Sequence, residues 1–148
     1  LDAGYGACHL RRPEIGRLVE NALLHFDGER YALLAWVIMP NHVHVLIESR
    51  PGHPLRQLAH SWKSYTAHQA GNLLRLSGPF WYHDYFDRFI RDKRHFSNTV
   101  RYIHYNPVTA GLVNEAADWP LSSARWFDQS PTVFVKTQAG RLRSQGEL

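Results

Sequence analysis

Residues 37–48, VIMPNHVHVLIE, decide the fold that we expect for this chain. Strand-forming aliphatic residues flank Pro40-Asn41, a turn signal, so the segment predicts a β-hairpin. His42 and His44 are separated by one residue and should project from one face of the second strand, while the aliphatic residues between and after them face the other side. Two imidazoles held side by side on a sheet can bind a metal ion. Two half-exposed strand histidines with no ligand would give the same pattern.

The composition fits a single domain with a polyanionic partner. The 148 residues are 44% hydrophobic and 13% aromatic, enough for one core. A net charge of +4 with neutral histidines and a pI near 9.5 suit a partner such as nucleic acid. Cys8 is the sole cysteine, which excludes an internal disulfide and favours a reducing compartment. No apolar run approaches ~18 residues and no signal peptide is evident, so we expect no membrane span.

Helix and strand signals alternate along the chain. We expect helices at residues 13–26, 55–69 and 95–105, and strands at residues 31–39, 42–48 and 80–90. The almost continuous apolar run of residues 31–39 predicts a central strand. Pro107 disfavours helix at Asn106, so the third helix should end near there.

This order of elements lacks only a leading strand for the βαββαβ pattern. We therefore predict an α+β fold, with a ferredoxin-like antiparallel sheet, helices on one face and the first strand missing. One domain should cover residues 1–130. Residues 131–148 contain few core residues but several basic ones, so we expect a flexible basic C-terminal extension.

Tyr102 and Asn106 lie four residues apart on the third predicted helix and so share one face of it. Val100 and Ile103 belong to the apolar stripe, which leaves the Tyr102 phenol able to face something other than the core. Alternatively, Tyr102 is a residue at the boundary of the apolar face and Asn106 a cap of the helix end.

Three motifs together resemble a known family. MPNHVHVLIE, then FWYHDYFDRFIRD, then YIHYNPVTAGLV, in this order and spacing, resemble the HUH-type tyrosine transposases that act on single-stranded DNA. The resemblance is closer to the REP-associated tyrosine transposases, and it covers about residues 13–126. The HxH pair alone is a weak motif, whereas the combination is specific.

The resemblance implies a site and a chemistry. His42, His44 and Asn106 would bind a divalent metal, Mg²⁺ or Mn²⁺, and the tyrosine-bearing helix would complete the HUH site. Tyr102 would attack a phosphodiester, form a 5′-phosphotyrosine bond and leave a 3′-OH, with the metal as Lewis acid. No general base is evident for this phenol, whose unperturbed pKa is about 10.

The implied function is metal-dependent cleavage and strand transfer of single-stranded DNA near hairpins, in transposition or in the processing of REP elements. The partner would be hairpin-bearing single-stranded DNA. The protein would be located in the cytoplasm of a bacterium, associated with the nucleoid. Basic residues in two groups are candidate phosphate contacts: Arg88, Arg91, Lys93 and Arg94 before the third helix, and Arg56 and Lys63 on the second. A solvated charged surface would give the same pattern.

The sequence departs from the family at its start. The family's first strand precedes the first helix and lies in the middle of the sheet, and residues 1–12 do not resemble it. Because the chain begins with Leu1 rather than methionine, we expect it to be a piece of a longer product. The missing strand would then come from residues upstream of Leu1 or from a partner. An exposed sheet edge favours swapping, so a monomer and a homodimer both stay open.

Two other hypotheses compete with the transposase hypothesis. A domesticated hairpin-binding protein without catalysis would keep the fold but would need none of His42, His44, Tyr102 and Asn106. An unrelated metal-binding or hydrolytic domain would have a purely structural Tyr102, far from the two histidines. The distance between Tyr102 and the histidines therefore discriminates between these possibilities.

Overall fold

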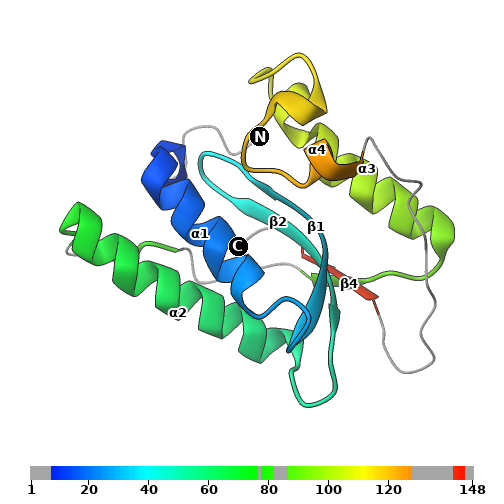
Figure 1. Cartoon of the computed structure of the whole chain (residues 1–148), viewed down its shortest axis with the longest axis horizontal. Coiled ribbons are helices and arrows are strands. Elements are labelled where there is room, and N and C mark those ends of the chain that lie inside the picture. Colours follow the sequence, from blue (N-terminus) through cyan, green and yellow to red (C-terminus); the bar gives the residue numbers. More distant parts are fainter. Residues whose placement is uncertain (1–7, 77, 82–86, 128–141, 146–148) are drawn as a thin grey trace.

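A computed structural model describes residues 8–76, 78–81, 87–127 and 142–145 as a small antiparallel sheet with helices on both faces (Figure 1). The predicted α+β class is therefore confirmed. The elements are η1 His9–Arg11, α1 Pro13–His25, β1 Tyr31–Ile38, β2 Val43–Ser49, α2 Leu55–Leu74, β3 Asp87–Phe89, α3 Lys93–Thr109, η2 Ala116–Asp118, α4 Ala124–Phe127 and β4 Leu142–Gln145.

The predicted hairpin is present and forms the largest strand pairing of the sheet. β1 and β2 are antiparallel, with Val37 opposite His44. The backbone N–H of Met39 donates to the carbonyl of His42 at 2.8 Å, which closes the turn around Pro40 and Asn41. The hairpin thus places His44 on β2 and His42 directly before this strand.

The helices α1 and α2 share one face of the hairpin, and the tyrosine-bearing helix α3 lies on the other face. α1 and α2 pack on the face that carries Val43, Val45 and Ile47. α3 packs on the other face, where its apolar side chains meet those of Ala35 and Leu46, and Figure 1 shows α3 across the sheet from α1 and α2. The apolar runs of β1 and β2 are long because both faces of these strands are covered.

The strand β1 lies at the edge of the sheet and not at its centre, since the strand order is β1-β2-β4-β3. Residues 121–123 cover its outer edge. Ile38 N–H donates to the Leu121 carbonyl at 2.8 Å and Ser123 N–H to the Trp36 carbonyl at 3.0 Å. An apolar run reports burial of the two faces of a strand and says nothing about how many strands flank it.

The helix α3 continues through Pro107, past its predicted end. The proline removes one helical donor, and α3 ends two residues later at Thr109. Gly111 has a φ of +74°. Leu112 N–H donates to the Pro107 carbonyl and Gly111 N–H to the Val108 carbonyl, both at 2.9 Å. These two bonds form a Schellman motif, so Gly111 ends α3 and Pro107 does not.

The helix α2 also runs beyond its predicted end, and α3 starts before its predicted start. Gly71 lies inside α2, which ends at Arg75 with a φ of +51°. Asp92 caps α3 by accepting the His95 backbone N–H at 2.8 Å. An aspartate N-cap therefore sets the start of α3 two residues before His95.

The middle of the sheet is occupied by a segment from the C-terminal end of the chain. β4 pairs with β2 on one side and with β3 on the other, both antiparallel. This is the position that the resemblance gives to a strand before the first helix. Of the predicted C-terminal extension, residues 142–145 form β4, and residues 128–141 and 146–148 lie outside the described residues. Of the predicted strand 80–90, residues 87–89 are strand and residues 82–86 are likewise outside.

Two glycine substitutions test the assigned helix ends. Gly111→Ala forces a side chain into a left-handed conformation and should lower the free energy of unfolding by about 1 kcal/mol. Gly71→Ala lies inside α2 with no atom within 4 Å of the new Cβ, so it should raise this free energy by about 0.5–1 kcal/mol. Urea unfolding of both variants measures the difference. Equal effects of the two substitutions would contradict the assignment of the helix ends.

Candidate active site

The two histidines project to the same side of the hairpin, as predicted, although β2 begins at Val43 and His42 directly precedes it. Their ring centroids are 4.7 Å apart and the rings are nearly perpendicular, at 82°. His44 is buried and His42 is half-buried. Both lie on the face toward α3, because Val43 and Val45 point into the core under α1 and α2.

Asn41 orients the first histidine. The Nδ1 atom of His42 lies 2.7 Å from the Oδ1 atom of Asn41. An amide oxygen only accepts hydrogen bonds, so Nδ1 carries the proton and the lone pair of the ring is on Nε2. Such a contact fixes the ring orientation of a metal-binding histidine. From the sequence, Asn41 was predicted only as a turn residue.

Tyr102 lies beside this histidine pair. The ring centroids of Tyr102 and His44 are 5.4 Å apart, and the tyrosine side chain is 60% exposed. The hypothesis of an unrelated domain required Tyr102 to lie far from the histidines, and the structure contradicts it. Asn106, half-buried one turn further along α3, lines the same cavity.

This cavity has a volume of about 460 Å³ and three walls: the segment around η1, the turn between β1 and β2, and the C-terminal half of α3. No Asp or Glu side chain lines it among the described residues. The lining residues are Cys8, Arg11, Met39, Pro40, Asn41, His42, His44, Arg101, Tyr102, Tyr105, Asn106, Thr109, Ala110 and Leu112.

Sequence reasoning missed several residues of the cavity. Arg101 and Tyr105 are near Tyr102 on the helix and could have been found from helical spacing alone. Cys8 and Arg11 carry no local signal. They reach the cavity because Leu10, between them, is buried against the core and holds η1 in place.

A buried polar network holds α3 against the edge of β1. The Nε2 atom of His104, a residue with no predicted role, lies 2.7 Å from the Ser123 hydroxyl. This hydroxyl accepts the Trp36 backbone N–H at 3.0 Å. The indole N–H of Trp119 donates to the Ile38 carbonyl at 2.9 Å. These directional contacts fix where α3, and with it Tyr102, lies relative to the hairpin.

The donor set of the cavity fits a divalent cation if an amide takes part. Among the residues that the structure describes, no three His, Cys, Asp or Glu side chains come together as a metal site. The ring centroids of His42 and His44 are 4.7 Å apart, so their nitrogen atoms are close enough to bind one ion together. A third protein ligand would have to be an amide oxygen, and Asn106 supplies one in the cavity wall.

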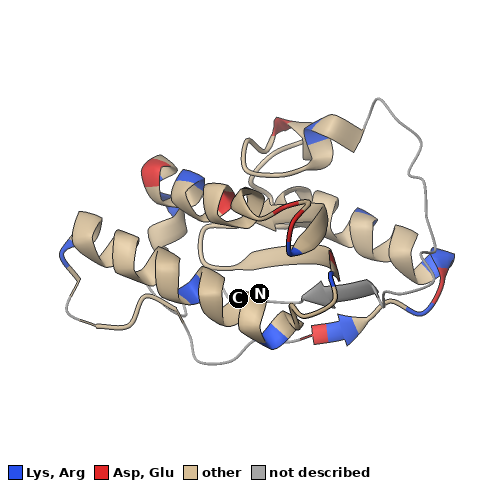
Figure 2. Cartoon of the chain, turned by 60° about the horizontal axis from the view of Figure 1, so that its bottom comes forward, with Lys and Arg blue, Asp and Glu red and all other residues tan. Residues whose placement is uncertain are grey.

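None of the six basic residues predicted to contact DNA lines the cavity. Arg56 and Lys63 are on α2, on the opposite side of the sheet. Arg88 lies on β3, and the remaining three, Arg91, Lys93 and Arg94, lie just before α3 or in its first turn, where all are exposed. Figure 2 shows the basic residues dispersed over α2, β3 and the start of α3. The structure therefore separates these residues from the histidines.

Comparison with known proteins places the chain in a family. A family model described as "Transposase IS200 like" matches residues 14–106, so the chain belongs to the IS200-like transposase family. The matched range includes the hairpin and the segment from Tyr102 to Asn106. The family resemblance read from the three motifs is thereby confirmed.

Two curated bacterial proteins are similar to this chain. The REP-associated tyrosine transposase of Escherichia coli K12 is 27% identical over 111 residues, covering 72% of this chain and 63% of that protein. The "Putative REP-associated tyrosine transposase" of Haemophilus influenzae is 30% identical over 112 residues, covering 67% and 60%. This chain thus spans less than two thirds of the length of either relative.

A solved structure has the same fold. It is a REP-associated tyrosine transposase bound to a REP hairpin, with a TM-score of 0.68 at 23% identity over 89% of this chain and 82% of that one. No helix within the described residues is long and apolar enough to cross a membrane.

The polar network under α3 is testable by removing its central hydroxyl. Ser123→Ala leaves the buried Trp36 N–H and the His104 ring nitrogen without this partner, which should lower the free energy of unfolding by about 1–3 kcal/mol. Ser97→Ala, at an exposed position of α3, should change it by less than about 0.5 kcal/mol. Urea unfolding gives both values, and a Ser123→Ala value as small as that of Ser97→Ala would show that the network does not anchor α3.

Proposed function

We propose that this chain is a metal-dependent single-stranded DNA endonuclease and strand transferase that cuts near DNA hairpins through a 5′-phosphotyrosine intermediate. One observation carries the proposal. The ring centroids of Tyr102 and His44 are 5.4 Å apart, and those of His44 and His42 are 4.7 Å apart. Asn106 lines the same cavity. A nucleophile and three metal-ligand candidates from distant parts of the chain thus meet at one place.

Tyr102 is the proposed nucleophile. Its phenol oxygen attacks the phosphorus atom of a phosphodiester, the bond to the 3′ oxygen breaks, and that oxygen leaves as a 3′-OH after taking a proton. The new bond joins the tyrosine oxygen to the 5′ phosphate. One phosphate ester replaces another, so a second 3′-OH can reverse the step and join two strands without ATP.

The phenol must lose its proton during the attack. No carboxylate among the described residues lines the cavity to accept this proton. Because Tyr102 is 60% exposed, solvent water can reach the hydroxyl and carry the proton away.

His42, His44 and Asn106 would hold Mg²⁺ or Mn²⁺. When bound, such an ion polarises a phosphoryl oxygen as a Lewis acid. Imidazole nitrogens suit borderline cations and an amide oxygen suits hard ones, so this mixed set favours Mn²⁺ over Mg²⁺. The Asn41 amide, which contacts His42 at 2.7 Å, keeps that ring in a metal-binding orientation.

The proposed substrate is single-stranded DNA that bears a hairpin, in transposition or in REP-element processing in the bacterial cytoplasm. Its support is the family, two bacterial relatives, and a solved relative bound to a REP hairpin. Four exposed basic residues are proposed to contact the DNA beyond the cavity: Arg88 on β3, and Arg91, Lys93 and Arg94 just before α3 or in its first turn. Arg56 and Lys63 form a separate proposed contact surface on α2.

Covalent capture of the substrate tests this function. Labelled hairpin-bearing single-stranded DNA is incubated with the protein and Mn²⁺, and a denaturing gel is inspected for a protein–DNA adduct. The adduct should form with the parent, disappear with EDTA and be lost in Tyr102→Phe, because phenylalanine lacks the oxygen that would form the bond. Tyr65→Phe, in an exposed tyrosine of α2, is the matched control and should retain the adduct.

The opposite results would refute the assignment. An adduct that survives Tyr102→Phe would show a different nucleophile. A parent protein that binds the hairpin tightly yet forms no adduct with Mn²⁺ would favour a domesticated protein that binds hairpins without cutting them.

A further inference from the structure

We propose that Arg11, Arg101 and Tyr105 form the contact surface for the DNA strand that enters the catalytic cavity. The two guanidinium groups would bind phosphates next to the scissile one, and the Tyr105 ring would stack on an unpaired base. All three line the cavity with Tyr102, and none belongs to the basic groups predicted from the sequence. This inference rests on the proposed function, since it takes single-stranded DNA as the ligand of the cavity.

The charge of the cavity favours a polyanion. Among the described residues that line it, only Arg11 and Arg101 carry a permanent charge, and none is acidic and able to neutralise them. An arginine is charged at every physiological pH and presents several N–H donors in a planar fork that matches phosphate oxygens. The cavity is thus positive next to the proposed nucleophile.

Arg101 is held in place by an aromatic ring. Its guanidinium carbon lies 5.7 Å from the centroid of the Tyr105 ring, four residues further along α3. A guanidinium that contacts a ring at this distance still has several N–H groups that can donate to phosphate. Since Arg101 directly precedes Tyr102, a phosphate bound by Arg101 would be near the phosphate under attack.

Arg11 comes from a different wall of the cavity. It ends the short helix η1, where its backbone N–H donates to the Cys8 carbonyl at 3.1 Å. The preceding residue, Leu10, is buried in the main core and holds this segment against α1. Arg11 is therefore exposed at its side chain but fixed at its backbone, so it can bind a phosphate at a defined place.

Tyr105 offers a surface for stacking. It lies three residues beyond Tyr102 on α3 and is 50% exposed at the cavity. Unpaired bases stack on exposed aromatic rings with little dependence on sequence. An exposed tyrosine beside a phosphate-binding arginine is the combination that single-stranded DNA requires.

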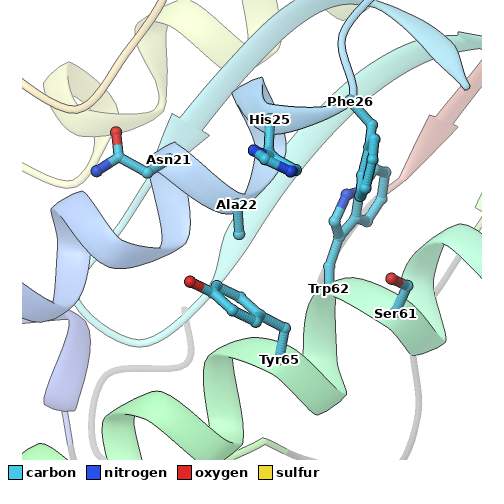
Figure 3. A pocket seen from close by; sticks show the side chains of 7 residues that line it. All are labelled: Asn21, Ala22, His25, Phe26, Ser61, Trp62 and Tyr65. Atoms are coloured by element: carbon cyan, nitrogen blue, oxygen red, sulfur yellow. The ribbon is translucent and has the colours of Figure 1, made fainter. Parts of the chain in front are cut away.

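A second cavity provides an internal control. It lies between α1 and α2, on the other side of the sheet, and its volume of about 470 Å³ is close to that of the catalytic cavity. Figure 3 shows the ring of Tyr65 from α2 in this cavity, opposite Ala22 of α1. Tyr65 is 53% exposed, similar to Tyr105. No Arg or Lys is among the described residues that line this cavity, so we expect no DNA contact there.

The test measures binding of a short fluorescent oligothymidylate by anisotropy, in EDTA so that no cleavage occurs, over a range of salt concentrations. Arg11→Ala and Arg101→Ala should each weaken binding and lower the slope of log K against log salt by about 0.7, the value for one phosphate contact on a single strand. Arg101→Lys should keep the slope, because the charge remains. Tyr105→Ala should weaken binding about 10-fold with an unchanged slope.

The matched controls are Arg17→Ala, an exposed arginine of α1, and Tyr65→Ala, which should both bind within twofold of the parent. The inference is overturned if Arg11→Ala and Arg101→Ala keep the parent slope, or if Tyr105→Ala binds no worse than Tyr65→Ala. Adduct formation separates this failure from that of the proposed function. Altered slopes without an adduct would refute catalysis and support the DNA surface, whereas an adduct with unaltered slopes would refute only the surface.

Discussion

The site depends on the packing of α3 against the hairpin face that carries the histidines. Phe96, Val100 and Ile103 are buried against this face, and each such side chain contributes about 1.5–3 kcal/mol. Successive residues of a helix are about 100° apart around its axis. Once the Ile103 stripe is fixed on the sheet, the direction of the neighbouring Tyr102 is fixed as well. The same hydrophobic burial that stabilises the fold therefore brings the phenol to the cavity beside His44.

Apolar packing is not directional, and polar contacts supply the missing precision. The bonds from the Ser123 hydroxyl to Trp36 and His104 prevent α3 from sliding along β1. At the turn between β1 and β2, the Asn41 amide sets the orientation of His42. Nucleophile and metal-ligand candidates are thus positioned by separate elements that meet only in the folded chain. A shift of α3 would move both Tyr102 and Asn106, because both lie on this helix and line the cavity.

Local patterns in the sequence predicted the local parts of this arrangement. The turn at Pro40, the alternation that puts His42 and His44 on one face, and the spacing of Tyr102 and Asn106 each depend on a few neighbouring residues. Long-range features were wrong or missed. An apolar strand does not reveal that α3 covers the face opposite α1 and α2, or that β1 is an edge strand. Arg11 joins the cavity only because η1 folds onto the core, which no spacing in the chain reports.

The central claim is that a metal held by the two histidines lies next to Tyr102. Fluorine NMR of protein labelled with fluorotyrosine, titrated with Mn²⁺, measures this directly, because the paramagnetic ion broadens nearby signals. We predict that the Tyr102 signal broadens first, that the Tyr65 signal on the far side of the sheet stays sharp, and that the broadening is lost in His42→Ala and in Asn106→Ala. Equal broadening of Tyr102 and Tyr65, or broadening of Tyr102 that survives His42→Ala, would contradict the composite site.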